Sequence, residues 1–148
     1  MQAHRSRFAK LFQPEPDGLF YLRCDKPMRE VADNIARTIV SEKIDFFIGD
    51  SIGYACAGRP EEAENANEYF RAVRSFGVGS LHLAHVTKAG AEDQKPDKPF
   101  GSAFFFNSAR AVWYIQAAKE NKEKQLSVGL YQKKNNLGSL RSPRAYTI

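Results

Sequence analysis

The sequence predicts a single α/β domain with a mainly parallel sheet and a β-hairpin near its C-terminal end. Its 148 residues are enough for one domain with a real core. Apolar strand-like segments alternate with amphipathic helical segments in the order β-α-β-α-β before the hairpin. Alternation of this kind predicts a parallel sheet with helices on both faces.

The first half of the chain contains two predicted strands and one predicted helix. Residues 1–17 are expected to form an irregular basic lead-in, and GLFYLRC at 18–24 the first strand. The near-continuous apolar run IDFFIGDS at 44–51 predicts a strand that is buried on both faces. Between them, 26–43 is predicted to be helical because its apolar residues recur at spacings of three and four: Met28, Val31, Ala32, Ile35 and Ile39.

The second half continues the alternation. A helix is predicted to begin at Pro60 and to bury Ala63, Ala66, Phe70, Val73 and Phe76. Three more strands are predicted at 80–86, 111–117 and 126–134. Between them, 87–99 are predicted to be a mobile polar loop, 101–110 a short helix or turn, and 119–125 a charged turn. The predicted domain spans 18–140, and 141–148 are expected to form an extended basic tail.

Composition and charge indicate the expected cellular location and the kinds of partner. The formal net charge of +5 is compatible with nucleotide or nucleic acid as a partner but does not require either. No apolar run approaches the roughly 20 residues of a membrane-spanning helix, and the N-terminus lacks the apolar segment of a signal peptide. We therefore expect a cytoplasmic protein without a membrane partner. The two cysteines, Cys24 and Cys56, are expected to be reduced structural thiols.

Polar residues follow three successive predicted strands. Asp25 comes after the first, Asp50 ends the second, and His85 ends the third, with Lys88 close behind. Ligands bind beyond the carboxyl ends of parallel strands, so these residues predict a site. Asp50 could cap the following turn, or it could be a magnesium-holding aspartate of the Walker B type, with Ser51 bonded to the same water shell.

Other chemistries fit the sequence poorly. A triad of Ser51, His85 and Asp50 lacks a G-x-S-x-G elbow. A zinc site from His82 and His85 is disfavoured because residues three apart on a strand point to opposite faces, so His82 is expected to be a packed core or interface residue. FGVGS follows a helix, which is the wrong order for a phosphate loop, and no G-x-x-x-x-G-K-[ST] motif is present.

The basic residues near the C-terminal strands can be interpreted either as surface residues or as functional ones. Arg110 lies between the aromatic cluster at 104–106 and the strand that carries Trp113. It is either a surface arginine whose stem covers aromatic rings or a functional cation. Lys133 and Lys134 end the last predicted strand, either as a solvated basic terminus or as part of a site.

Four segments, in order, resemble the downstream half of RecA-like ATPases: IDFFIGDS, LHLAHVTK, PFGSAFFFNSARAVW and VGLYQKKNNLG. The most similar branch is that of the helicase-type ATPases of plasmids and phages, relatives of the hexameric replicative helicases. The resemblance covers about residues 18–140. It implies a RecA-like three-layer α/β/α fold that lacks the strand carrying the phosphate-binding loop (P-loop).

The resemblance also implies a role for each matched residue. Asp50 would be the Walker B aspartate that holds Mg²⁺, through water, beside ATP. His85 would be the sensor of the terminal phosphate, and Lys88 would belong to the same signature. Arg110 would be an arginine finger that reaches a neighbouring subunit's nucleotide. Lys133, together with Asn135, would form a second cationic finger; such cations stabilise charge on the transferring phosphoryl group.

Two departures from the family shape the functional hypotheses. Asp25 stands where the family has a catalytic glutamate, and its carboxylate is shorter. The Walker A lysine and its loop are missing from the sequence. The first hypothesis is therefore a partial or truncated RecA-like ATPase of the DNA helicase and replication type. The alternative is a non-catalytic assembly or nucleic-acid-binding module derived from that fold, and an unrelated parallel α/β hydrolase is a weaker third.

The missing strand also predicts a partner. In the family's sheet it lies between the strand ending at His85 and the strand beginning near Arg110. Without it, those strands would have unpaired edges or would pair with each other. Either outcome would leave an adhesive surface, so we expect self-association, or pairing with a P-loop-bearing chain, through the surface that carries Arg110 and Lys133. DNA is a further possible partner.

Overall fold

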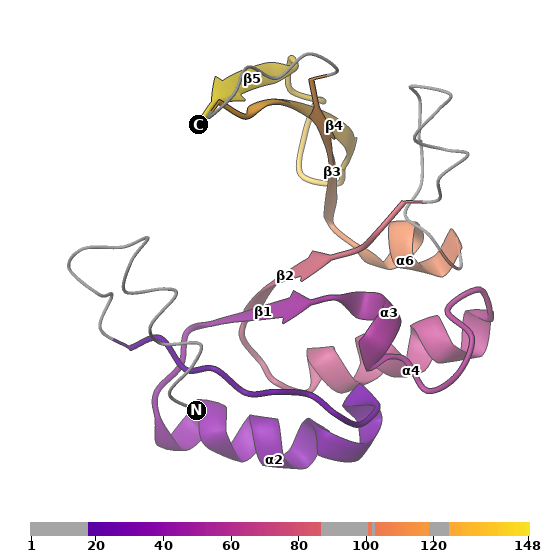
Figure 1. The fold of residues 1–148 in the computed structure, drawn as a ribbon. Helices are drawn as coiled ribbons and strands as arrows, with labels where there is room; N and C mark the ends of the chain where they lie inside the picture. The colour runs from indigo at the N-terminus through magenta and orange to yellow at the C-terminus, as the bar shows by residue number, and fades with distance from the viewer. Residues whose placement is uncertain (1–17, 87–100, 102, 119–124) are drawn as a thin grey trace.

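The computed structural model describes residues 18–86, 101, 103–118 and 125–148, which form a mixed α/β structure (Figure 1). The strands make two separate sheets, a parallel pair β1-β2 and an antiparallel sheet in the order β3-β4-β5. The described elements are α2 (Met28–Ser41), β1 (Phe46–Asp50), α3 (Ile52–Ala55), α4 (Ala63–Arg74), β2 (Gly79–Leu83), α6 (Ala103–Ser108), β3 (Ala111–Ala117), β4 (Ser127–Asn135) and β5 (Arg144–Thr147).

The core lies between the parallel pair and two helices. α2 buries residues at helical spacing, as predicted: Met28, Ala32, Ile35 and Ile39. α4 contributes Ala66, Tyr69, Phe70 and Val73. Both helices lie on the same side of β1 and β2 (Figure 1). The ring of Phe47 on β1 meets that of Phe76 edge to face, with ring centroids 5.2 Å apart, and so joins the sheet to this helical layer.

The other face of the parallel pair is not covered by described residues. Phe46, Ile48, Leu81 and Leu83 are each between 41% and 57% exposed. The predicted burial of 44–51 on both faces is therefore wrong for the part of the chain described here. The physical reason is that α2 and α4 both pack on one face, and no described helix covers the opposite one.

The predicted first strand at 18–24 is not a strand. β1 pairs with β2, and neither pairs with this segment. A β-strand requires a hydrogen-bonded neighbour, so the apolar composition of the segment does not suffice. Leu19, Phe20 and Leu22 are about half exposed, and Cys24 packs against the core.

The second predicted helix begins three residues later than expected. α4 starts at Ala63, which is exposed, while Tyr69 takes the core position that the sequence analysis overlooked. Asn65 fixes the preceding turn because its side-chain amide donates to the Arg59 carbonyl oxygen at 2.9 Å and to the Glu62 carboxylate at 3.0 Å. The predicted loop after β1 contains the short helix α3.

The C-terminal part forms a three-stranded sheet rather than a hairpin with a tail. β3 and β4 pair antiparallel as predicted, and β5 adds to the other edge of β4. The 141–148 segment is extended as expected, but it is part of a sheet. Leu126 and Ile148 exchange two backbone hydrogen bonds of 2.9 Å, and the hydroxyl oxygens of Ser127 and Thr147 lie 3.0 Å apart. These contacts lie far apart in sequence, so local pattern could not predict them.

α6 connects the antiparallel sheet to the core, and the predicted short helix at 101–110 is confirmed. Phe105 is 2% exposed, and its ring centroid lies 6.4 Å from that of Tyr69 and 6.1 Å from that of Phe70. From β4, the Lys134 ammonium donates to the carbonyl oxygens of Phe106 (3.1 Å) and Asn107 (2.8 Å). A cation at these terminal carbonyls stabilises the helix end. Lys134 therefore has a structural role.

Gly49 is the tightest position in β1, and we predict that Gly49→Ala destabilises the fold by about 1–3 kcal/mol. A Cβ atom there would lie 2.9 Å from the Tyr69 hydroxyl oxygen and 3.2 Å from His82 Nδ1. Gly53→Ala is the control, because no atom lies within 4 Å of its Cβ position and alanine favours the helix. Urea unfolding measures both variants. Equal free energies of unfolding for Gly49→Ala and the parent protein would contradict the prediction.

Candidate functional site

Asp50 and His85 come from adjacent parallel strands and lie at the same end of them. The register runs from Phe46 opposite Gly79 to Asp50 opposite Leu83, and His85 follows two residues later. The arrowheads of β1 and β2 point the same way, toward α3 and α6 (Figure 1). Both side chains are exposed. Two of the predicted residues, Asp50 and His85, thus lie at the carboxyl-end edge of the parallel strands.

Asp25, another predicted edge residue, is not part of this arrangement. Asp25 precedes α2 and follows no strand, and its carboxylate accepts a 2.6 Å hydrogen bond from Nε of Arg23 in an exposed ion pair. The predicted edge of three strands therefore reduces to two. Lys88, like the predicted loop 87–99, lies outside the described residues.

Ser51 and Asp50 are neighbours with different surroundings. Asp50 is exposed, whereas Ser51 is 7% exposed and occupies the position before the first turn of α3. The peptide bond between them is cis. Ser51 therefore belongs to the buried base of this edge, and the exposed functional group is the Asp50 carboxylate.

A hydrogen-bonded chain on the inner face of the sheet runs from buried Tyr69 through half-buried His82 to exposed Ser80. The hydroxyl of Tyr69 is 2.7 Å from His82 Nδ1, and His82 Nε2 is 2.9 Å from the Ser80 hydroxyl. The imidazole also packs against the rings of Phe47 and Phe70. The chain links α4 to β2, and Gly49 leaves the space for it.

Burial keeps this chain uncharged. Desolvation lowers the pKa of His82 below its ordinary value of 6.5, and desolvation is also the main cause that raises the pKa of Tyr69. His82 was predicted to be a packed core or interface residue, and it is half-buried and packed against the rings of Phe47, Tyr69 and Phe70. Among the described residues no group of three metal-ligating side chains occurs. The sequence analysis did not predict that Tyr69 is buried. Its position next to the predicted core residue Phe70 could have indicated this.

The two cysteines behave as structural thiols, as expected, since both are free. Cys56 is buried, and burial raises the pKa of its thiol to about 11. A thiol with such a pKa stays protonated near neutrality, and the thiolate is the reactive form. Cys24 donates from its sulfur to the Lys26 carbonyl oxygen. A cysteine nucleophile at Cys56 is thus disfavoured.

The predicted cationic residues lie on the antiparallel sheet. Arg110 is exposed and directly precedes β3. Lys133 occupies a register shift in β4: Val112 pairs with Lys134 and Trp113 pairs with Gln132, so Lys133 is the extra residue. Such bulges redirect a side chain out of the regular alternation. Asn135 has a structural role instead, because its side chain bonds to the backbone of Leu137 and Ser139 in the following turn.

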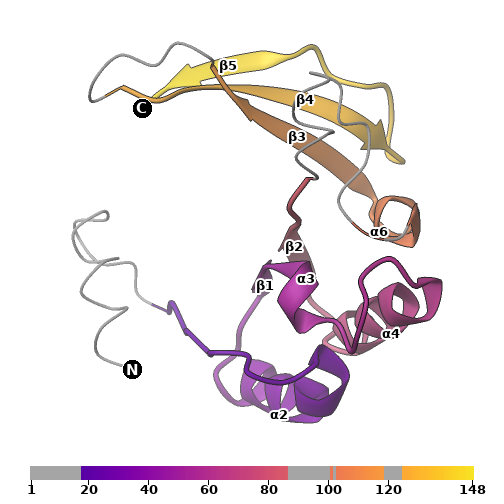
Figure 2. The same ribbon diagram turned by 45° about the vertical axis from the view of Figure 1, so that its right-hand side comes forward.

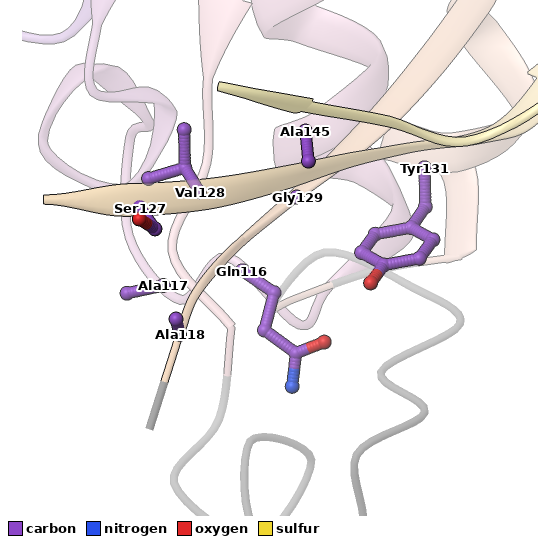
Figure 3. A pocket seen from close by; sticks show the side chains of 8 residues that line it. All are labelled: Gln116, Ala117, Ala118, Ser127, Val128, Gly129, Tyr131 and Ala145. Carbon is purple, nitrogen blue, oxygen red and sulfur yellow. The ribbon is translucent and has the colours of Figure 1, made fainter. Parts of the chain in front are cut away.

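Two hollows of about 340 Å³ each lie away from the sheet edge. One sits on the antiparallel sheet over small residues, with Tyr131 and Gln116 at its side (Figure 3). The other lies between residues 18–20 and the segment that joins α2 to β1. Neither hollow is lined by a residue that the sequence analysis assigned to the site.

Comparison with models of protein families finds no match, and comparison with curated proteins finds no significantly similar sequence. Among the described residues, no helix has the length and apolar character needed to cross a membrane.

We predict that His82 makes the fold less stable in mild acid. Since its folded pKa is lowered, the unfolded chain takes up a proton below about pH 6.5 that the folded chain does not. Stability contributed by neutral His82 is thus present above that pH and is lost as the pH falls toward the folded pKa. The slope from this residue is at most about 1.4 kcal/mol per pH unit.

Urea unfolding between about pH 7 and pH 5 tests this prediction. His82→Gln should remove the extra loss of stability, because a neutral amide still bonds to Tyr69. His85→Gln is the matched control, since His85 is exposed, and it should keep the parent profile. If His82→Gln follows the parent profile as well, His82 does not have the assigned role.

Proposed function

We propose that this chain carries the downstream half of a RecA-like ATPase site of the DNA helicase and replication type. Asp50 is its Walker B aspartate, His85 its phosphate sensor, and Arg110 and Lys133 its cationic fingers. The P-loop, which this sequence lacks, would be supplied by a P-loop-bearing partner chain. These roles come from the resemblance of the four sequence segments to RecA-like ATPases.

The parallel pairing of β1 and β2 is the observation that carries the proposal. It brings Asp50 and His85, 35 positions apart in the sequence, to the same sheet edge. Ligands of open parallel sheets bind at such edges. The carboxylate extends from β1, and on the inner face of that strand the ring of Phe47 packs against Phe76 and His82. A rigid base is what positioning of a metal-bound water requires.

The donor set fits magnesium bound together with a nucleotide. One exposed carboxylate at a strand end is too little for a site made of protein ligands alone. Magnesium usually keeps several waters and is held by one or two carboxylates plus substrate phosphates. Bound there, Mg²⁺ would neutralise charge on the phosphates of ATP. Asp50 would hold its water shell, and His85 would hydrogen-bond the terminal phosphate.

The cations would act on a neighbour's nucleotide. Arg110 and Lys133 lie on a different sheet from Asp50 and His85. Positive charge that serves a second subunit belongs near a subunit boundary, so this separation suits fingers that act between chains. The bulge at Lys133 turns that side chain away from the regular ladder, as recurs next to active sites.

A second candidate function is a non-catalytic nucleic-acid-binding or assembly module. The observation that favours it is the charge distribution. Residues 101–148 contain eight basic and two acidic residues, whereas 1–100 contain 14 basic and 15 acidic ones. ATP hydrolysis with a P-loop partner separates the two functions, because only the first predicts that such a partner restores turnover.

We expect Mn²⁺-ATP to broaden NMR signals of the residues around Asp50 and His85, through the unpaired electrons of the metal. Asp50→Asn should weaken this effect by at least about tenfold, since carboxylates that support metal ligands typically contribute that much affinity. Asp45→Asn is the matched control: Asp45 is also exposed but stands at the opposite end of β1. Equal broadening in both variants would remove Asp50 from the site.

We also expect the chain alone to show no significant ATP hydrolysis. Without a P-loop, neither backbone amides nor a lysine grips the β- and γ-phosphates. Phosphate release with Mg²⁺-ATP should match that of Asp50→Ala, and addition of a P-loop-bearing RecA-like subunit from the same genome should raise it only for the parent chain. Turnover by the pure chain that Asp50→Ala abolishes would refute this expectation.

A further inference from the structure

The charged side chains that the structure describes on the antiparallel sheet are all basic. Its described residues, with α6, contain five basic side chains and no acidic one: Arg110, Lys133, Lys134, Arg141 and Arg144. Lys134 is engaged with α6. Arg110, Arg141 and Arg144 are exposed. Clustered positive charge without interspersed carboxylates attracts polyanions and makes their binding sensitive to salt.

One face of this sheet combines exposed aromatic rings with an arginine. In Figure 3, Val128 points to the opposite side from Gln116 and Tyr131, which marks the two faces. Side chains two apart on a strand share a face, and paired residues share it across strands. By this register, Val128 is on the face of Ala117 and Tyr146, which we call the aromatic face.

Three successive rows make up the aromatic face. Trp113 pairs with Gln132 in the first, Ile115 with Leu130 and Arg144 in the second, and Ala117 with Val128 and Tyr146 in the third. Trp113 is 40%, Ile115 60% and Tyr146 47% exposed. Arg144, also exposed, thus stands in the row between two exposed aromatic rings.

The spacing suits an extended polymer better than a single small molecule. Strand separation and rise place Trp113 and Tyr146 roughly 15 Å apart on the face. Bases stack on exposed aromatic rings, while arginine binds the intervening phosphates, and this combination recurs in sheets that bind single strands. A protein partner would be expected to bury the apolar residues, but it would need an acidic surface to match the basic side chains.

We propose that the aromatic face binds single-stranded nucleic acid, with bases stacked on Trp113 and Tyr146 and the backbone held by Arg144. This surface is distinct from Asp50 and His85 and does not depend on the proposed ATPase site. The flanking cations Arg110 and Arg141 add to the attraction without reading sequence. Binding is therefore expected to tolerate any base sequence and to weaken as salt rises.

The single tryptophan of the chain makes a direct test possible, because Trp113 is the only indole. Titration with an oligothymidylate of about 20 nucleotides, in EDTA and without ATP, should quench tryptophan fluorescence as a base stacks on the ring. A fluorescein-labelled oligonucleotide should give the affinity by anisotropy, falling as salt rises from about 50 to 200 mM.

Paired variants locate the surface. Tyr146→Ser should weaken binding about fivefold or more, whereas Tyr54→Ser, at a ring 85% exposed on α3, should not. Arg144→Gln should weaken binding and lower the salt slope by about 0.7; Arg37→Gln removes an equal charge from α2 and should leave both unchanged. Circular dichroism melts check that each variant is folded, and Trp113→Phe should retain most of the affinity.

Three outcomes would overturn the proposal. The first is the absence of oligonucleotide binding at low salt. The second is binding without tryptophan quenching, or with equal effects of the Tyr146 and Tyr54 variants. The third is an oligomer that Tyr146→Ser dissociates while no oligonucleotide binds, which would identify the face as a protein interface. Since no nucleotide or metal is present, each result is independent of whether the ATPase proposal holds.

Discussion

The packing of α4 against β2 is the constraint on which the rest of the structure depends. Tyr69 donates or accepts at His82, and Phe70 packs on the same imidazole. The rings of the same two residues, Tyr69 and Phe70, also receive Phe105 of α6. One aromatic cluster thus fixes the parallel strands and the entry to the antiparallel sheet. The hydrogen bond carries particular weight, because a buried polar pair is costly to leave unsatisfied and so defines one arrangement.

This packing explains why the inner face of the parallel strands is uncharged while Asp50 and His85 are exposed. Along β1, side chains alternate between the two faces, so Phe47 enters the core while Asp50 is exposed. On β2, His82 faces inward and His85 lies beyond the strand. The two histidines, three residues apart, therefore have different roles. His82 holds the helix, and the imidazole of His85 is accessible to a ligand.

Local pattern predicted the elements better than it predicted their assembly. The spacing of Met28, Ile35 and Ile39 located α2, and the run before Asp50 located β1. The strand at 18–24 failed because strand formation depends on a neighbour, which composition does not report. β5 was missed for the same reason: Thr147 pairs with Ser127, 20 positions away. For the site, parallel order alone placed Asp50 with His85, but it also placed Asp25 there wrongly.

The two sheets are separate, and this leaves strand edges to which a partner could add a strand. β2 pairs only with β1 in the described chain, and β3 pairs only with β4. Of the two arrangements expected from a missing strand, this is the one with unpaired edges. Strand edges that have no strand partner among the described residues, as on β2 and β3, present backbone N–H and C=O groups that are templates for an added strand. Leu81, Leu83 and Ile115 expose apolar surface on these same strands. A P-loop-bearing strand that paired with them would bury apolar surface and place phosphate-binding backbone next to the edge that carries Asp50.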